Sequence, residues 1–276
     1  MCYSHKTQPL LIAIAVVLLL VTSLPAQKLK TPQVEGDYVG LTQLGVVEPE
    51  PNEIGLEIVI QDDRRFLGSI NYLELDNLLV AGSIAKSGKC QIVADSDEAQ
   101  ASIQLDWQSR GGGAATLLGE LALSTERDRQ TGPVAFLRPF DDRAIDWSAE
   151  AGRYPATFTS AGGEPIDASF DIANGFRGIL QATIPGWVNP DTDPVLPDPP
   201  GWVDPDPQPV VVGTTNTAGG FIAVGVGSGP NQIVTLTGRV TTDRAGLPVS
   251  LDGTYLIEHT TGKLLDLGTF RVLIAP

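Results

Sequence analysis

A short pattern of apolar, any, Gly, any, apolar recurs along the chain and constrains its fold more than any other feature. Its six copies are Phe66–Ile70, Val80–Ile84, Leu117–Leu121, Phe176–Leu180, Leu236–Val240 and Leu251–Tyr255. In a strand, residues two apart share a face, so the two apolar side chains and the glycine would point to one core. A glycine inside a strand is tolerated where the sheet bends or another backbone approaches closely. Because barrels need such bends at repeated positions, the pattern predicts strongly curved sheet.

The rest of the chain supports an all-β fold. Ile103, Leu105 and Trp107 alternate with polar residues, which is the period of a half-buried strand. Near residue 55, the same alternation predicts Leu56, Ile58 and Ile60 on one face. We therefore expect antiparallel meander strands that form one or two barrel-like or sandwich units. In the sandwich alternative, the pattern glycines make room for large neighbours across a flat core.

Two sets of strands are expected, joined by a polar connection. The first unit covers residues 34–138, with about eight strands, and the second covers 152–276, with residues 139–151 between them. Gly36-Asp37-Tyr38 opens the first unit, and Gly152-Arg153-Tyr154 echoes it at the start of the second. This echo favours a weak internal duplication.

The N-terminal segment has the pattern of an export signal. Lys6 precedes an apolar run from Leu10 to Val21, and Pro25-Ala26 follows it. A basic start, an apolar core and a small residue at a cleavage point are typical of a secretory signal peptide. Residues 1–26 are therefore predicted to be a signal helix, cleaved after Ala26, and the protein is expected to be secreted, periplasmic or at the cell surface. An uncleaved anchor is the alternative.

Charge and cysteine content exclude several classes of function. The chain of 276 residues carries a formal net charge of −15, which repels phosphate backbones and argues against nucleic-acid binding. Signal cleavage would remove Cys2 and leave Cys90 without an internal disulfide partner. It would also leave no apolar segment expected to span a membrane as a helix.

Candidate site residues concentrate in an insertion rich in Asp and Pro at residues 186–209. Trp187 and Trp202 each precede an acidic segment there and are candidates for stacking on a sugar or a partner, or for pinning the insertion to the barrel wall. No cofactor is expected, and zinc is disfavoured because the chain has few His and Cys residues. Hard oxygen ligands would suit Ca²⁺, and five residues with such side chains stand at alternate positions in two runs. These candidate metal ligands are Asn189, Asp191, Asp193, Asp204 and Asp206. The alternative is a solvated linker.

No catalytic residues are predicted. The only histidine after the signal segment is His259, which follows a predicted strand and precedes Thr260 and Thr261. A Ser-His-Asp or Cys-His site would have to use it, and no nucleophile motif is present. We interpret His259 as a residue near a turn.

The opening Gly-x-Tyr-x-Gly at residues 36–40, with Phe-x-Gly-x-Ile at 66–70, resembles repeated barrel units of exported bacterial proteins without an assigned function. It is similar, more distantly, to calycin-like barrels. The resemblance covers residues 36–138 best. It implies a fold and no activity.

These observations lead to three functional hypotheses. The first is an exported, non-catalytic structural or binding module with a protein or polysaccharide partner. The second is a carrier that holds a small ligand inside a barrel, which requires an apolar cavity of roughly 300 Å³ or more. The third is a carbohydrate-active hydrolase using paired carboxylates.

Overall fold

The computed structural model describes residues 30–44, 51–72, 75–96, 99–125, 129–173, 179–187 and 208–274. Residues 31–276 make up one compact unit. The predicted signal helix at 1–26 lies outside the described residues. The same holds for the pattern copy around Gly178.

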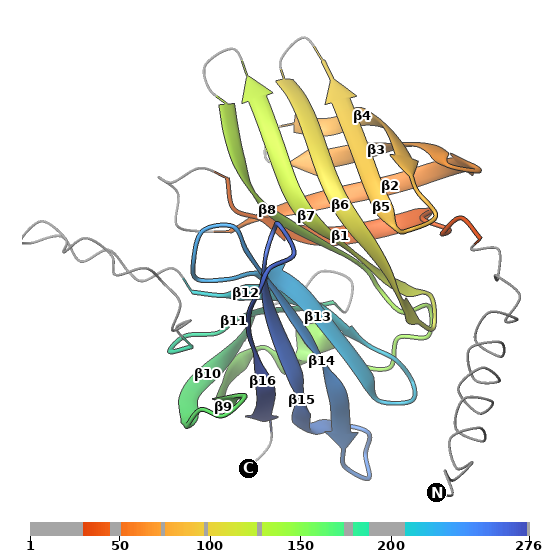
Figure 1. Cartoon of the computed structure of the whole chain (residues 1–276). Helices are drawn as coiled ribbons and strands as arrows, with labels where there is room; N and C mark the ends of the chain where they lie inside the picture. Colours follow the sequence, from red (N-terminus) through yellow and green to blue (C-terminus); the bar gives the residue numbers. More distant parts are fainter. Residues whose placement is uncertain are drawn as a thin grey trace, which may run out of the picture. The chain divides into compact units, whose positions relative to one another are not determined.

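The first eight described strands close into an antiparallel barrel in which each strand pairs with the next in sequence. Val39–Thr42 of the first strand pair with Val134–Leu137 of the last, which closes the ring. Figure 1 shows this barrel in orange to yellow-green. Its strands are β1 (Gly36–Thr42), β2 (Asn52–Asp62), β3 (Arg65–Tyr72), β4 (Leu75–Ile84), β5 (Lys89–Asp95), β6 (Ala99–Gly111), β7 (Ala114–Thr125) and β8 (Arg129–Arg138).

A second closed barrel follows, built from the remaining eight described strands with the same neighbour order. Here β9 pairs with both β10 and β16, so the first and last strands again close the ring. Its strands are β9 (Gly152–Ser160), β10 (Pro165–Ala173), β11 (Leu180–Thr183), β12 (Val210–Thr215), β13 (Gly220–Val226), β14 (Gln232–Thr242), β15 (Pro248–His259) and β16 (Leu264–Leu273). The all-β prediction is confirmed in its barrel form, with two barrels.

The pattern glycines lie where neighbouring backbones come close. A Cβ at Gly68 would collide with the carbonyl of Glu57, and one at Gly119 with the carbonyl of Gln104. Gly82 lies under the ring of Phe66, its direct cross-strand neighbour. The glycines therefore both permit tight coiling and leave room for large neighbours, so the two roles considered from sequence occur together in a closed barrel.

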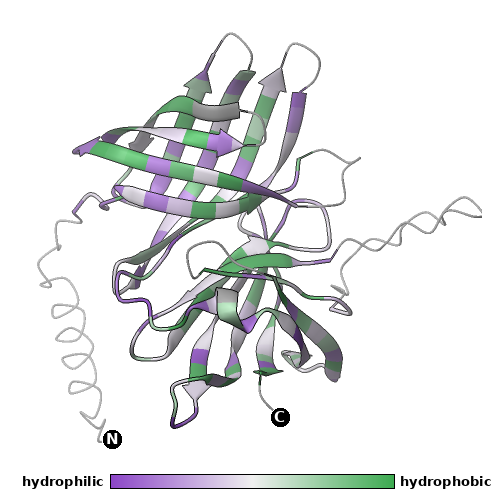
Figure 2. Cartoon of the chain, turned by 180° about the vertical axis from the view of Figure 1, so that it is seen from behind, coloured by the Kyte–Doolittle hydropathy of each residue, from purple (hydrophilic) through white to green (hydrophobic). Residues whose placement is uncertain are grey.

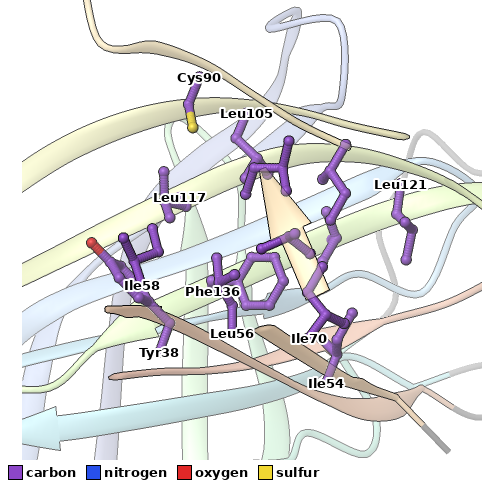
Figure 3. Close-up of a cluster of buried hydrophobic side chains, with 14 of the residues drawn as sticks. Tyr38, Ile54, Leu56, Ile58, Ile70, Cys90, Leu105, Leu117, Leu121 and Phe136 are labelled. Carbon is purple, nitrogen blue, oxygen red and sulfur yellow. The ribbon is translucent and has the colours of Figure 1, made fainter. Parts of the chain in front are cut away.

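Side chains fill the interior of the first barrel. The alternation predicted for β6 is confirmed, because Ile103 and Leu105 are buried and Trp107 packs against the same cluster. Figure 2 shows the alternation of hydrophobic and hydrophilic residues along the strands, and Figure 3 shows side chains from several strands meeting in this core. The barrel interior is thus a packed core with contributions from every strand.

Aromatic side chains dominate the core of the second barrel. Trp187 stacks on Phe158 with ring centroids 4.2 Å apart, and Tyr255 meets Trp187 edge-on at 4.8 Å. Trp147, on the short 3₁₀ helix η1 (Trp147–Glu150), is fully buried and meets Phe221. The connection between the barrels was predicted to be polar and irregular, but it contributes this large core side chain.

The first strand of each barrel makes the same local contact. The Tyr38 hydroxyl donates a hydrogen bond to the Val34 carbonyl at 2.9 Å, and the Tyr154 hydroxyl donates one to the Glu150 carbonyl at 3.0 Å. Each tyrosine lies two residues after the glycine that begins its barrel and bonds four residues upstream. The shared arrangement supports the internal duplication suggested by the two Gly-x-Tyr segments.

One predicted orientation is wrong. Ile60 was expected to face inward with Leu56 and Ile58, yet it is exposed on the outer wall. The register of β2 against β3 shifts between Ile58 and Ile60, which is a β-bulge at Val59. A bulge inserts one residue into a strand and reverses the alternation beyond it, so Ile60 points outward and Gln61 points inward.

A third hydrophobic cluster joins outward-facing residues of both barrels within the compact unit 31–276. The first barrel contributes residues of β1, β7 and β8, and the second contributes residues of β12, β13 and β14. Phe140 of the connection lies in the same cluster. The members are Leu41, Ala114, Leu118, Ala135, Leu137, Phe140, Ile179, Val212, Ile222, Val224, Val226 and Ile233. We call this contact region the junction.

Candidate functional site

An apolar pocket of about 350 Å³ lies at the edge of the junction. Val39 and Gly55 point outward from β1 and β2, while Ile179 and Val212 belong to the second barrel. Glu53, Asn71 and Gln181 supply polar groups to the same wall. The pocket is therefore formed between the two barrels and not inside either of them.

Gly55 keeps this pocket open. A Cβ built on Gly55 would meet only the side chain of Asn71, at 3.7 Å, which is ordinary contact. The glycine is thus not required by close packing of backbones, in contrast to Gly68 on the next strand. A larger side chain at position 55 would occupy space that a ligand could fill.

A second hollow, of about 570 Å³, adjoins the first and shares Val39 and Ile179 with it. Arg138 crosses its wall: Nε donates to the Gly113 carbonyl at 2.8 Å, and Nη1 donates to the Glu35 carbonyl at 2.6 Å. The guanidinium also lies 5.7 Å from the centre of the Tyr38 ring. Burial raises the pKa of Tyr38 to about 12, although the charge of Arg138 opposes this. Arg138 is therefore held in place by the fold.

A third hollow, of about 400 Å³, is polar. Lys89 and Asp106 form an ion pair of 2.7 Å on its wall. Near Asp106, burial lowers the pKa of Arg110 and raises the pKa of Glu258, while the charge of each partly offsets the shift of the other. The Lys89–Asp106 pair therefore gives the hollow a charged wall suited to polar contacts, with Arg110 and Glu258 partly desolvated nearby.

The structure places only part of the predicted insertion. Trp187 is 2% exposed and lies in the aromatic core of the second barrel. Phe158 covers one face of its indole, and Tyr255 meets it edge-on. The other candidate residues lie outside the described residues: Trp202, Asn189, Asp191, Asp193, Asp204 and Asp206.

His259 is the last residue of β15 and takes part in a local turn. Its Nδ1 lies 2.9 Å from the Thr261 hydroxyl and accepts a hydrogen bond from the Thr261 amide. Within the described ranges, no group of three or more His, Cys, Asp or Glu side chains is arranged to hold a metal ion. Over the same residues, no helix has the length and apolar character needed to cross a membrane.

Cys90 is expected to be unreactive in the folded protein. Its side chain lies among the core residues of the first barrel, as Figure 3 shows, and burial raises its thiol pKa to about 12. Since the thiolate is the reactive form, this rise leaves very little of the thiol ionised at pH 8. A disulfide exchange reagent at pH 8 should label no cysteine in folded protein beginning at Gln27, and one after unfolding in guanidinium. Rapid labelling of the folded protein would contradict this burial.

The pocket residues carried no signal in the sequence. Val39 and Gly55 are cross-strand neighbours in the first barrel, and they meet Ile179 and Val212 only when the barrels contact each other. Each has the residue type expected of an ordinary strand position. Only the structure brings them together.

No protein-family model and no curated protein sequence matches the chain. Among solved structures, a protein of unknown function from the DUF3598 family of Nostoc punctiforme is 10% identical, with a TM-score of 0.27, over 91% of this chain and 99% of that chain. A provisionally named outer membrane protein of Bacteroides fragilis is 13% identical, with a TM-score of 0.28, over 87% and 97%. A provisionally named AttH of Nitrosomonas europaea is 12% identical, with a TM-score of 0.24, over 86% and 91%. Likenesses this distant assign no function to the chain.

Proposed function

We propose that the protein is an exported, non-catalytic binding module that holds a small apolar ligand in the junction pocket. The observation that carries this proposal is the pocket of about 350 Å³ lined by Val39, Gly55, Ile179 and Val212. Ligand pockets are commonly of roughly 300–1,000 Å³, mostly apolar, with a few polar groups that orient the ligand. Glu53, Asn71 and Gln181 would supply those groups here.

The packing of the barrels supports a site outside them. Trp147, Phe158 and Phe170 are fully buried within the second barrel, and Phe136 is fully buried within the first. Interiors filled by side chains of this size leave the outer walls as the place for a ligand. The packed interiors argue against the hypothesis of a carrier that holds its ligand inside a barrel, and the site proposed here lies between the barrels instead.

The positions of the two reactive residue types support a non-catalytic role. His259 is engaged with Thr261 in a turn, and Cys90 is buried in the first core with its pKa raised. Neither lines the junction pocket. A general base and a nucleophile within hydrogen-bond reach of each other are the usual mark of covalent catalysis, whereas the His259 ring is bonded to Thr261 and the Cys90 side chain packs in the first core.

Export rests on the sequence of residues 1–26, with its basic start, apolar run and Ala26. An N-terminus at Gln27 in protein recovered outside the cytoplasm would support it. An intact N-terminus on membrane-bound protein would favour the anchor instead. The acidic insertion at 186–209 remains a proposed contact for a protein or polysaccharide partner, with Ca²⁺ as a proposed ligand of its carboxylates.

The junction pocket can be tested with Nile red, a neutral apolar dye whose fluorescence rises on transfer from water. We expect saturable binding of about one dye per protein, and we expect Gly55→Leu to weaken it about tenfold or more. The new side chain would occupy the pocket without a backbone collision, because the nearest atoms to a Cβ at this position belong to Asn71. Fluorescence titration of both proteins gives the two dissociation constants.

Gln100→Leu is the matched control, since Gln100 is exposed on β6 and does not line the pocket. It adds a similar apolar side chain elsewhere and should leave binding unchanged. Thermal unfolding should confirm that both variants remain folded. Equal dye affinity for wild type and Gly55→Leu, or no saturable binding at all, would reject the junction pocket as the site.

A further inference from the structure

The outer wall of the first barrel carries a continuous row of apolar side chains across four neighbouring strands. Ile60 of β2 is paired with Leu67 of β3. Leu67 is paired in turn with Ala81 of β4, and Ala81 with Val93 of β5. Directly opposed residues of antiparallel strands have Cβ atoms about 5 Å apart, so each of these four side chains lies in contact range of the next one in the row.

Val59 and Leu79 widen the row into a patch, which we call the β2–β5 ridge. Ala81 is exposed, and the exposed fraction of the larger members runs from 48% at Val93 to 78% at Leu79. Its members are Val59, Ile60, Leu67, Leu79, Ala81 and Val93. Together they expose on the order of 500 Å² of apolar surface, a size at which a contiguous patch is often an interaction site.

The bulge in β2 creates part of this ridge. Regular alternation would have placed Ile60 inside the barrel beside Ile58. Instead, the extra residue at Val59 turns both Val59 and Ile60 outward, each more than half exposed. Beyond the bulge, Gln61 turns inward and binds the N-terminal stretch, accepting from the Val34 amide at 2.8 Å and donating to the Pro32 carbonyl at 2.8 Å. The exposed pair is therefore fixed by the architecture of the barrel end.

Charged residues flank the ridge at both edges. At the hairpin end, Arg64, Arg65 and Lys86 lie among Asp62, Asp63 and Glu35, whose carboxylate accepts a hydrogen bond from the Gln61 amide. At the other edge lie two carboxylates. Glu57 of β2 is paired with Ser69 of β3, which is paired in turn with Leu79 of β4. Asp95 is the last residue of β5, the next strand. The hairpin edge thus carries three cations together with three carboxylates, whereas Glu57 and Asp95 lie at the opposite edge, with the apolar row between them.

We propose that the β2–β5 ridge is the face through which two copies of this chain form a twofold-symmetric dimer. A twofold axis sets each surface against itself, so residue i of one copy contacts residue j of the other, and the reverse. Rotation about an axis along the apolar row places the edge with Arg64, Arg65 and Lys86 of one copy over the edge with Glu57 and Asp95 of its partner. Apolar rows then meet at the centre, and the two sets of charge pairs lie at the rim.

The size of the patch fits such a pair. A standard interface buries about 800 Å² per partner, with an apolar centre and a polar rim. The ridge would supply the centre, and the charged residues at both edges would supply the remainder. Because a closed barrel has no free strand edge, the contact is a packing of sheet faces and not strand addition.

Sedimentation of the purified protein across concentrations tests the proposal. We expect a monomer–dimer equilibrium with a dissociation constant on the order of 10 µM. Leu79→Asp should weaken the dimer about tenfold or more, because it puts a charge at the most exposed apolar position of the ridge. Leu247→Asp is the matched control, since Leu247 is an exposed leucine of the second barrel, 58% exposed, and should leave the equilibrium unchanged.

A charge exchange sharpens the test. Arg65→Glu alone should weaken the dimer, and Arg65→Glu combined with Glu57→Arg and Asp95→Arg should restore most of it. Wild type that stays monomeric up to about 100 µM overturns the proposal. The same holds if both aspartate variants lose the dimer equally, or if the protein binds vesicles of neutral lipid through the ridge as a monomer. The dye titration at the junction pocket is independent, since Leu79→Asp should leave it unchanged.

Discussion

Replacement of Gly68 by valine is expected to lower the free energy of unfolding by about 3 kcal/mol or more. A Cβ at this position would collide with the backbone carbonyl of Glu57 on the paired strand. A carbonyl in a ladder cannot rotate away as a side chain can, so the strands would have to separate or shift. Overpacking of a core by movable side chains costs about 1–3 kcal/mol, and a backbone collision exceeds that range. The midpoint of urea denaturation, followed by far-UV circular dichroism, measures the change.

Gly55→Val on the neighbouring strand β2 is the control for this substitution. Neither glycine has a positive φ, so neither needs the left-handed region, and both sit within strands. They differ in what a side chain would meet, because position 55 faces outward with its nearest contact at 3.7 Å. The control should change stability by less than about 1 kcal/mol. Similar losses for both variants would show that glycine at position 68 is not required by close approach.

Trp187→Ala is expected to lower the free energy of unfolding by about 3–5 kcal/mol, the usual cost of removing a buried large aromatic side chain. The indole is 2% exposed and lies between Phe158 and Tyr255 in the second barrel. Loss of the indole would leave a cavity beside the rings of Phe158 and Tyr255, which both pack against it. Urea denaturation followed by near-UV circular dichroism reports the repacking of those rings as well as the global transition.

Trp187→Phe serves as the partner variant, since it keeps an aromatic ring against Phe158 and removes only part of the volume. It should lose less than half as much stability as the alanine variant. If Trp187→Ala unfolds at the same urea concentration as the wild type, the side chain is not part of the core. That outcome would instead fit a tryptophan on the surface that contacts a ligand.

The curvature of the sheets was predictable because it requires glycines between apolar residues within strands, and this pattern is visible in the sequence. Gly68, Gly119 and Gly238 each stand between inward apolar residues, and each lies against a neighbouring backbone in the structure. The choice between a barrel and a sandwich was not predictable from these residues alone. Closure depends on the pairing of β1 with β8 and of β9 with β16, and segments so distant in sequence carry no local sign of their contact.

The orientation of Ile60 shows a second limit. In the run from Leu56 to Gln61, Val59 is apolar where regular alternation would place a polar residue, but this alone does not distinguish a bulge from an exposed apolar side chain. The bulge is set by tertiary contacts, since Gln61 must turn inward to bind Val34 and Pro32 at the barrel end. Trp147 was missed for a related reason: it stands in a polar connection without periodicity, and only the open end of the second barrel gives it a buried place.

The junction pocket could not be predicted from local sequence patterns. It needs the outer wall of one barrel and residues of the other, and outward-facing Val39 or Val212 resembles any strand residue. The candidate residues predicted from the sequence were the tryptophans and oxygen-bearing side chains of a single segment, the insertion at 186–209. Of those, Trp187 is described by the structure, and it lies in the core.

The ring of the first barrel closes between Val39 and Leu137, which are roughly a hundred residues apart along the chain. A polypeptide that leaves a ribosome or a membrane channel with its N-terminus first would therefore present β1 and its neighbours long before β8 arrives. Until then, β1 has one free side, and the apolar residues meant for the interior are open to water and to other chains. Folding should be slow for this length, and a holding chaperone during transit would protect the incomplete ring from aggregation.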